Sequence, residues 1–328
     1  MREITYREAI REALREEMRR DERVFILGED VADAGGVFKV TLGLLAEFGP
    51  ARVIDTPLSE SAIVGAAVGA SLMGMRPVAE IMFADFTTVA MDGLVNHAAK
   101  VHYLYGGELS APLVVRMAYG AGPKWGAQHT QCVESWLANV PGLTIVMPST
   151  PADAKGLLKA AIRTPNPVVF LEHKQLYGKK GEMPEGEHIA PIGRAEVKRS
   201  GDDVTIVASG MMVDRALAAA ASLAQEGPSA EVIDLRSVQP LDTETILASV
   251  EKTGRLVIVH EAPVHGGFGG EIAAVAANKA LGFLDAPIQR VGGPWAPIPF
   301  GPVLTDAYVP KAADIIQAVR STLGATVA

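Results

Sequence analysis

The sequence lacks the residues that several classes of protein require. Its single cysteine, Cys132, excludes an internal disulfide bond and a metal or iron–sulfur site built from several cysteines. Lysine and arginine number 30 against 38 aspartates and glutamates, so the formal net charge is −8. A chain of this charge without a basic block is a poor candidate for binding nucleic acid or an anionic membrane.

Long uncharged apolar runs are also missing. The most apolar one, residues 61–75, is shorter than the roughly 20 residues that a spanning helix needs. Another uncharged run, residues 135–152, is interrupted by Pro141, Pro148 and Pro151. The N-terminal residues are heavily charged and do not resemble a signal peptide. We therefore expect a soluble, cytoplasmic protein that contacts no membrane.

What is present is an alternation of short apolar strands and longer helical segments. In the first half we predict strands at residues 24–27, 77–83, 112–117, 143–147 and 167–171. Helices are predicted after the capping box of Thr5 and Glu8, and at residues 61–74, 86–105 and 151–163. This alternation predicts an α/β fold, with a mostly parallel sheet covered by helices on both faces.

The length of 328 residues is sufficient for about two domains of roughly 150 residues. Residues 174–203 are rich in glycine, proline and charge, which is typical of a crossing between domains. Alternation then resumes, with strands at 195–198, 204–208, 230–235, 255–259 and 287–291, and helices at 213–225, 243–252, 270–281 and 310–323. We predict a first domain at 1–176, a linker at 177–194 and a smaller α/β domain at 195–328.

Glu60 is the most informative residue. It lies in the first turn of a predicted helix that has no other ionisable group for its whole length. Taken alone, such an acid is more often a solvent-exposed partner of the positive end of the helix dipole. The functional alternative is a carboxyl group that is held in an apolar wall and shares a proton with a ligand.

A second feature is the loop at residues 120–131, directly after the strand at 112–117. Ligands bind at the carboxyl ends of strands in open parallel sheets, so His129 is placed to reach a substrate. An ordinary loop histidine is an equally good interpretation. Phe86 follows the strand at 77–83; by itself, it is better explained as a core residue than as a stacking platform.

The glycine cluster at residues 266–270 lies between a predicted strand and a predicted helix. It does not match the dinucleotide fingerprint G-x-G-x-x-G and has no downstream acid to bind a ribose. We interpret it as a tight turn and predict no nucleotide binding there.

Taken together, these residues resemble a known family, the beta subunit of the thiamine-diphosphate-dependent first component of 2-oxo acid dehydrogenase complexes. The resemblance covers nearly the whole chain. It rests on seven ordered motifs: Gly28-Glu29-Asp30, Arg52 through Glu60, Gly74-Met75-Arg76-Pro77, Ala127-Gln128-His129-Thr130-Gln131, Asp153 through Leu158, Val232 through Arg236 and Lys252 through Leu256. It implies a transketolase-like pyrimidine-binding domain followed by a transketolase C-terminal-type domain.

The resemblance also implies roles for three residues. Glu60 matches the acid that bonds a ring nitrogen of the thiamine aminopyrimidine, and Phe86 matches the aromatic residue that packs on that ring. Protonation of the ring nitrogen favours the imino form of the exocyclic amine, which can take the proton from the thiazolium carbon. His129 matches the active-site histidine, which is expected to orient or protonate the 2-oxo acid or the intermediate derived from it.

Half of the family's cofactor site is absent from the sequence. Binding of the diphosphate through magnesium requires a Gly-Asp-Gly motif, and the only Gly-Asp here, Gly201-Asp202, is followed by Asp203. The resemblance therefore implies an alpha subunit that holds the magnesium, in a heterotetramer of two alpha and two beta chains. A lipoyl domain of a transacylase would accept the acyl group.

Family members also hold a structural potassium ion. Leu113, Ala161, Ile162 and Asn166 match its carbonyl or amide ligands, whereas Thr164 replaces the usual acid. We therefore keep potassium as an open expectation.

Three alternatives stay open for function. Oxidative decarboxylation of pyruvate is favoured, and the branched-chain and acetoin-cleaving relatives are rivals. Residues 17–21 and 172–174 are similar to the acetoin branch, whereas the short stretch at 31–40 and residues 260–263 are more similar to the pyruvate and branched-chain enzymes. A non-catalytic scaffold subunit is the alternative of another class, and the presence of both Glu60 and His129 argues against it.

Overall fold

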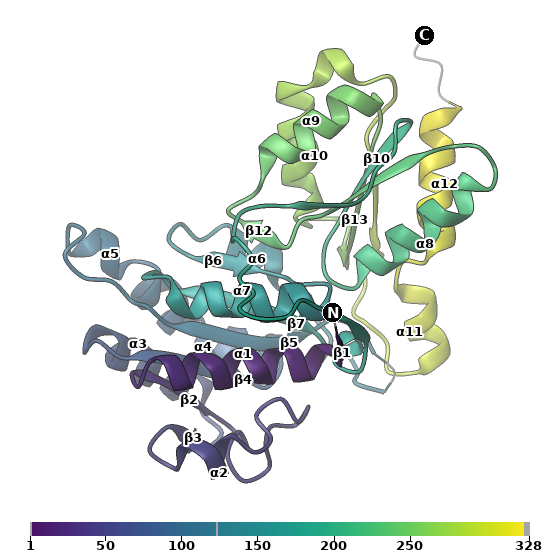
Figure 1. Ribbon diagram of the computed structural model, residues 1–328. Helices are drawn as coiled ribbons and strands as arrows, with labels where there is room; N and C mark the ends of the chain where they lie inside the picture. Colours follow the sequence, from purple (N-terminus) through teal and green to yellow (C-terminus); the bar gives the residue numbers. More distant parts are fainter. Residues whose placement is uncertain (1, 123, 325–328) are drawn as a thin grey trace. The chain divides into compact units, whose positions relative to one another are not determined.

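The chain forms two compact units, shown in the computed structural model of Figure 1, which describes residues 2–122 and 124–324. The first unit contains the described residues up to 119 together with residues 136–192. The second contains the described part of residues 120–135 and the described residues from 193 onward. The loop that carries His129 therefore groups with the second unit, although it follows a strand of the first.

The first unit is built on parallel strands, as the alternation predicts. β2 (Val24–Gly28), β3 (Val53–Asp55), β4 (Arg76–Ile81), β5 (Val114–Tyr119), β6 (Thr144–Val146) and β7 (Val168–His173) lie in the order β6-β7-β5-β4-β2-β3. Each neighbouring pair is parallel. Every residue of β2, β5 and β7 is buried, which explains why their sequences are mostly apolar; Arg116 of β5 and Glu172 of β7 are charged exceptions.

Several helices of this unit have the predicted bounds to within a residue or two. α1 (Tyr6–Arg20) begins at the capping box of Thr5 and Glu8, α3 covers Glu60–Leu72 and α7 covers Pro151–Arg163. α1 and α7 lie side by side, joined by ion pairs such as Lys155 to Glu16 at 2.6 Å. Two short helices, α2 (Leu44–Phe48) and η3 (Lys174–Leu176), lie outside the predicted elements.

The predicted helix at residues 86–105 is wrong as a single element. The structure divides it into η1 (Ala84–Phe86), α4 (Thr87–Asp92), the π-helical η2 (Gly93–Ala98) and α5 (Val101–Leu104). Gly93 lies against α3, where a Cβ atom would come within 2.8 Å of Val64 Cγ1. The close approach of α3 requires a glycine at this position, and a glycine also weakens the regular helix there.

Strand pairing also extends into the predicted linker. β8 (Lys180–Met183) pairs antiparallel with β1 (Arg2–Thr5), so the two ends of the first unit's sequence are joined. The apolar pattern predicts neither strand, because each is short and carries charge. The domain boundaries given above stay a prediction.

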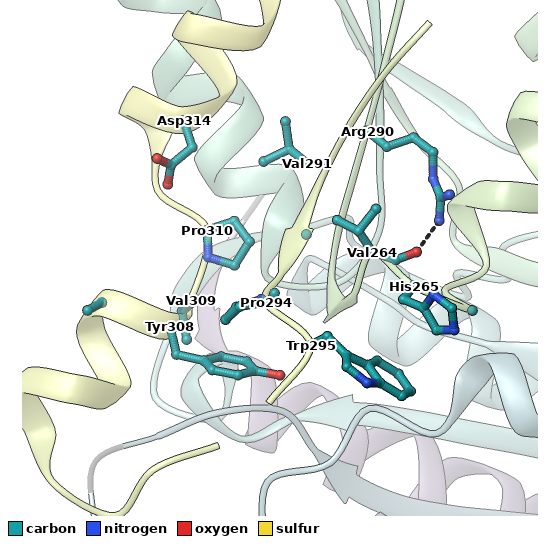
Figure 2. Close-up of a pocket in the computed structure, with 14 residues that line it drawn as sticks. Val264, His265, Arg290, Val291, Pro294, Trp295, Tyr308, Val309, Pro310 and Asp314 are labelled. Carbon is teal, nitrogen blue, oxygen red and sulfur yellow. Dashed lines mark hydrogen bonds between the residues drawn. The ribbon is translucent and has the colours of Figure 1, made fainter. Parts of the chain in front are cut away.

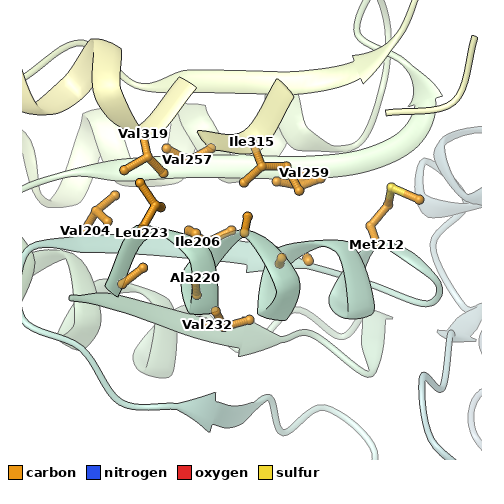
Figure 3. Close-up of a cluster of buried hydrophobic side chains, with 14 of the residues drawn as sticks. Val204, Ile206, Met212, Ala220, Leu223, Val232, Val257, Val259, Ile315 and Val319 are labelled. Carbon is orange, nitrogen blue, oxygen red and sulfur yellow. The ribbon is translucent and has the colours of Figure 1, made fainter. Parts of the chain in front are cut away.

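The second unit contains its own sheet. β9 (Glu196–Arg199), β10 (Val204–Ala208), β11 (Ala230–Asp234), β13 (Leu256–Pro263) and β14 (Gln289–Gly293) lie in the order β14-β13-β10-β11-β9, and only the β9 pairing is antiparallel. α8 (Met212–Ala224) and α12 (Ala312–Leu323) cover one face, where Figure 3 shows Leu223 and Val319 meeting strand residues. α9 (Thr243–Thr253) and α10 (Gly269–Lys279) contribute to a second apolar cluster that also includes strand residues.

Shorter elements complete this unit. They are α6 (Glu134–Ala138), whose first residues belong to it, β12 (Ser237–Gln239), η4 (Leu281–Phe283) and α11 (Pro302–Tyr308). Through the described part of the chain, every helix is too short or too polar to cross a bilayer.

Candidate functional site

Glu60 is the first residue of α3 and is half-buried. The N-terminal turn of α3 is held by Ser61, whose Oγ donates to the carbonyl oxygen of Val89 at 3.1 Å. This bond joins the helix that carries Glu60 to α4, the helix that follows Phe86. Glu60 therefore lies on a helix that contacts α4, and α4 begins directly after Phe86.

A second acid, Glu29, follows β2 and lies close enough to interact electrostatically with Glu60. Its side chain is 8% exposed, and its Oε1 atom has no hydrogen-bond partner among the described residues. Burial and the charges of Glu60 and Asp30 raise the pKa of Glu29. The charge of Glu60 therefore makes ionisation of Glu29 less favourable. The sequence signal was available, because Glu29 is an acid directly after a buried strand.

Phe86 ends η1 and is half-buried, with its ring edge-to-face with that of Phe83 at 6.2 Å between centroids. Phe83 in turn meets Phe38 at 6.0 Å, and Phe38 stacks on Tyr177 at 4.7 Å. An aromatic ring in such a cluster is held in one orientation by its neighbours. The structure therefore allows both interpretations of Phe86, part of a core or a firm platform.

The first unit also contains a buried ion cluster that the sequence analysis missed. The Arg116 guanidinium donates to Glu80 at 2.6 Å and to both oxygens of Glu172 at 2.7 and 2.8 Å. The Tyr177 hydroxyl donates to Glu172 at 2.8 Å, and burial raises the pKa of that hydroxyl well above its usual value. The residues come from β4, β5, β7 and the turn after β7. Only strand pairing brings them together.

His129 lies in the second unit and is half-buried. We call the described part of residues 120–135 the His129 segment. Thr130 Oγ1 donates to the carbonyl oxygen of Gly126 at 2.7 Å, which closes a turn around the histidine. Glu261 of β13 accepts hydrogen bonds from the amide of Ala121 and from the Cys132 thiol, on either side of His129. One carboxylate therefore contacts the segment at Ala121 and again at Cys132.

The residues predicted to bind potassium are partly engaged within the protein. The carbonyl oxygen of Ile162 accepts a hydrogen bond from the Arg76 guanidinium at 2.7 Å, and that of Leu113 accepts from the amide of Val168 at 3.0 Å. Ala161 bonds to the cap of α7 at Thr164, and Asn166 is exposed. A carbonyl oxygen has two lone pairs, so these oxygens could still coordinate an ion. The Arg76 guanidinium, however, places a positive charge beside the carbonyl group of Ile162.

The second unit contains no magnesium motif at its Gly-Asp sequence. A Cβ atom on Gly201 would come within 2.2 Å of the Ala230 backbone, and Asp203 Oδ2 accepts from the amide of Ser229 at 2.7 Å. These residues form the turn before β10. Through residues 2–122 and 124–324, no group of three or more His, Cys, Asp or Glu side chains is arranged to hold a metal.

The glycine cluster at 266–270 forms the predicted turn from β13 to α10. A Cβ atom on Gly267 would come within 2.5 Å of His260 Cε1, and one on Gly269 within 2.7 Å of His260 Cδ2. The glycines therefore make room for a buried imidazole. Nearby, a pocket of about 730 Å³ is lined by His265, Trp295 and Tyr308, as Figure 2 shows. It contains none of the predicted site residues.

Comparison with known proteins now identifies the family. Residues 2–180 match the family model "Transketolase, pyrimidine binding domain", and residues 193–315 match "Transketolase, C-terminal domain". A solved structure, "Split gene transketolase, inactive beta4 tetramer", superposes with a TM-score of 0.81 at 27% identity, covering 98% of each chain. The two-domain transketolase-like fold is thereby confirmed.

Curated relatives place the chain within this fold family. It is 50% identical to "Acetoin:2,6-dichlorophenolindophenol oxidoreductase subunit beta" of Cupriavidus necator, over 98% of both chains. It is 48% identical to "2-oxoisovalerate dehydrogenase subunit beta" of Bacillus subtilis, over 97% of this chain and 98% of the relative. It is 46% identical to "Pyruvate dehydrogenase E1 component subunit beta" of Rhizobium meliloti, over 98% of this chain and 70% of the relative. The chain belongs to the family of beta subunits of the first component of 2-oxo acid dehydrogenases.

Proposed function

We propose that this chain is the beta subunit of a thiamine-diphosphate-dependent 2-oxo acid dehydrogenase, with pyruvate as its substrate. The observation that carries the proposal is Glu60 at the start of α3, beside the buried and partly unpartnered Glu29, within a matched pyrimidine-binding domain. Thiamine diphosphate would supply a carbon nucleophile and an electron sink for cleavage of the bond beside the substrate carbonyl.

Glu60, Glu29 and Phe86 have the chemistry that binding of an aminopyrimidine ring needs. A ring nitrogen needs a carboxyl group that can hold or move a proton, and Glu60 provides one on the first turn of α3. Beside Glu60, burial and the nearby acidic charges raise the pKa of Glu29, which favours a carboxyl group that can hold a proton. Phe86, held by Phe83, would support the flat face of the ring.

His129 is proposed to act on the substrate. Its half-buried imidazole lies on the segment between Ala121 and Cys132, the two residues that donate to Glu261. A histidine in this setting can donate a proton to, or orient, the carboxylate or carbonyl oxygen of a 2-oxo acid.

The remainder of the cofactor site is proposed to belong to an alpha subunit. The described residues hold no metal-binding group of three or more His, Cys, Asp or Glu side chains, and the Gly-Asp sequence is used in a turn. We infer a heterotetramer of two alpha and two beta chains, in which the alpha chain holds the magnesium and a lipoyl-bearing transacylase accepts the acyl group. The structural neighbour is an inactive tetramer of beta chains, which supports the inference that a beta chain alone lacks activity. The potassium site stays a prediction.

Acetoin cleavage is the second candidate function. It is favoured by the 50% identity to the acetoin-oxidising relative, against 48% and 46% for the two 2-oxo acid enzymes. These values differ too little to choose a substrate.

The experiment that decides is co-expression with the cognate alpha chain and an assay of three substrates: pyruvate, a branched 2-oxo acid and acetoin. We expect thiamine- and magnesium-dependent turnover with pyruvate. Turnover of acetoin with none of pyruvate would select the second candidate. A complex that assembles but acts on none of the three would support the scaffold alternative instead.

A further inference from the structure

Two buried polar side chains of the second unit line one small cavity, and one polar atom of each has no hydrogen-bond partner among the described residues. Glu134, the first residue of α6, is 3% exposed, and His260 of β13 is 5% exposed. Glu134 Oε2 and His260 Nε2 have no partner among the described residues. Both side chains line the cavity, together with Ser209 and apolar residues.

The protonation of His260 follows from its second nitrogen. Nδ1 lies 2.9 Å from the carbonyl oxygen of Ala262, and a carbonyl can only accept, so Nδ1 carries the proton. Burial, with the nearby charge of Arg290, lowers the pKa of His260 to about 4, so the ring is neutral and Nε2 is an acceptor in need of a donor.

Glu134 is suited to be the source of that donor. Burial, with the charge of Glu261, raises its pKa to about 7, so a large share of the carboxyl groups is protonated at neutral pH. The charged groups that act on the pair are Glu261 on β13 and Arg290 on β14. Neither of these two groups forms a hydrogen bond with Glu134 Oε2 or His260 Nε2, so a proton shared between the two atoms is still needed.

The cavity has room for one small molecule. It offers about 10 Å³ to the centre of a water molecule, close to the minimum that one water occupies. A buried water needs two to four polar partners, and Glu134, His260 and Ser209 are available. Gly267, Gly269 and Gly292 surround the imidazole and fix its ring position, since a Cβ atom on any of them would come within 2.9 Å of it.

We propose that one internal water links protonated Glu134 to His260, and that this link positions the His129 segment. Glu134 donates to the water, and the water donates to His260 Nε2. With Glu261, which holds Ala121 and Cys132, the link gives the segment a third attachment to β13, five residues after His129. Glu134 and His260 are positioning residues, and the inference rests on the proposed role of His129.

The test compares Glu134→Gln, which keeps a donor but cannot ionise, with Glu134→Leu, which removes the donor. Glu251→Gln, on an exposed face of α9, is the matched control. Backbone hydrogen–deuterium exchange of the full chain is measured over residues 124–135 at pH 6 and pH 8.5. We expect Glu134→Leu to exchange about tenfold faster than the parent at pH 6 and Glu134→Gln to match the parent there.

At pH 8.5 the unmodified carboxyl group is ionised and the link loses its donor. Glu134→Gln should then exchange more slowly than the parent protein at the same pH, and the control should not. In the assembled complex, Glu134→Leu should lower kcat about 10- to 100-fold, whereas Glu134→Gln should retain kcat and lose less activity on the alkaline side. These kinetic effects depend on the proposed function, but the exchange measurements do not.

Equal exchange in Glu134→Gln and the parent at both pH values would overturn the proposal. So would unchanged exchange in a folded Glu134→Leu variant. If Glu134→Leu does not fold, the pH dependence of Glu134→Gln still decides. Exchange that behaves as expected in a complex inactive on all substrates would contradict the proposed function alone.

Discussion

At the scale of single residues, the pair Glu60 and Glu29 concentrates negative charge where a cofactor is proposed to bind. One carboxyl group is half-buried and the other almost wholly buried, and the burial raises the pKa of Glu29. Buried negative charge destabilises a fold, and carboxyl groups with a raised pKa are typical of sites where a proton is exchanged.

We predict that Glu60→Gln slows proton exchange at the thiazolium carbon in the assembled complex. The amide is nearly isosteric, so fold and assembly should persist, but it cannot pass a proton to the ring nitrogen. A loss on the order of 10²–10⁴-fold is expected, measured by exchange of the thiazolium hydrogen before substrate is added. Exchange within threefold of the parent would return Glu60 to the helix-dipole role. Glu108→Gln, exposed in the same unit, is the control.

Arg116 gives a prediction about stability. Replacement by Met leaves Glu80 and Glu172 buried without their cation, so the variant should lose about 3–5 kcal/mol of unfolding free energy at neutral pH. Chemical denaturation measures the loss. Arg194→Met, which breaks an exposed ion pair with Glu244, should change stability by less than about 1 kcal/mol. Equal effects in the two variants would contradict a structural role for the buried cluster.

Glu134 gives a pH dependence whose sign is fixed. Its folded-state pKa, about 7, lies above the ordinary 4.5, so its contribution to stability is complete below pH 4.5 and is lost as pH rises through 7. Glu134→Gln should match the parent in acid and exceed it by about 3 kcal/mol above pH 7. Urea denaturation from pH 4.5 to 8 measures the difference. A constant difference across this range would contradict the raised pKa.

At the scale of elements, the turn from β13 to α10 is shaped by the imidazole that it surrounds. We predict that Gly267→Ala destabilises the second unit by about 1–3 kcal/mol, because the new methyl group would meet both His260 and the backbone oxygen of Pro263 at 2.5 Å. Gly282→Ala, in open space, is the control. Thermal denaturation distinguishes the two, and equal melting temperatures would show that the turn can shift.

At the scale of the whole molecule, the chain is proposed to carry one half of a shared site. We predict that the purified chain alone is inactive and binds thiamine diphosphate only weakly, since its sequence has no Gly-Asp-Gly motif for magnesium. Calorimetry should show no micromolar binding, and addition of the alpha chain should restore it. Micromolar binding by the lone chain would contradict the shared site. Sedimentation of the complex should show two chains of each kind rather than one.

The sequence by itself determined the class of fold, because strands that are buried on both faces must be apolar throughout and helices between them must be amphipathic. It also indicated Glu60 and His129 through their places after or between such elements, and its family resemblance is confirmed by the comparisons. Their roles in catalysis remain proposals. Periodicity along one segment could not predict the change from α-helix to π-helix at Gly93, where Val64 of another helix approaches closely.

Tertiary structure alone decided which distant residues meet. Arg116, Glu80 and Glu172 are far apart in sequence, and the parallel register of β4, β5 and β7 places them within hydrogen-bonding distance. The assignment of the His129 segment to the second unit has a similar cause: Glu261 of β13 accepts the bonds from Ala121 and Cys132, which local propensity does not encode. Periodicity reports burial along one element, whereas charge pairing and shared cavities depend on contacts between elements.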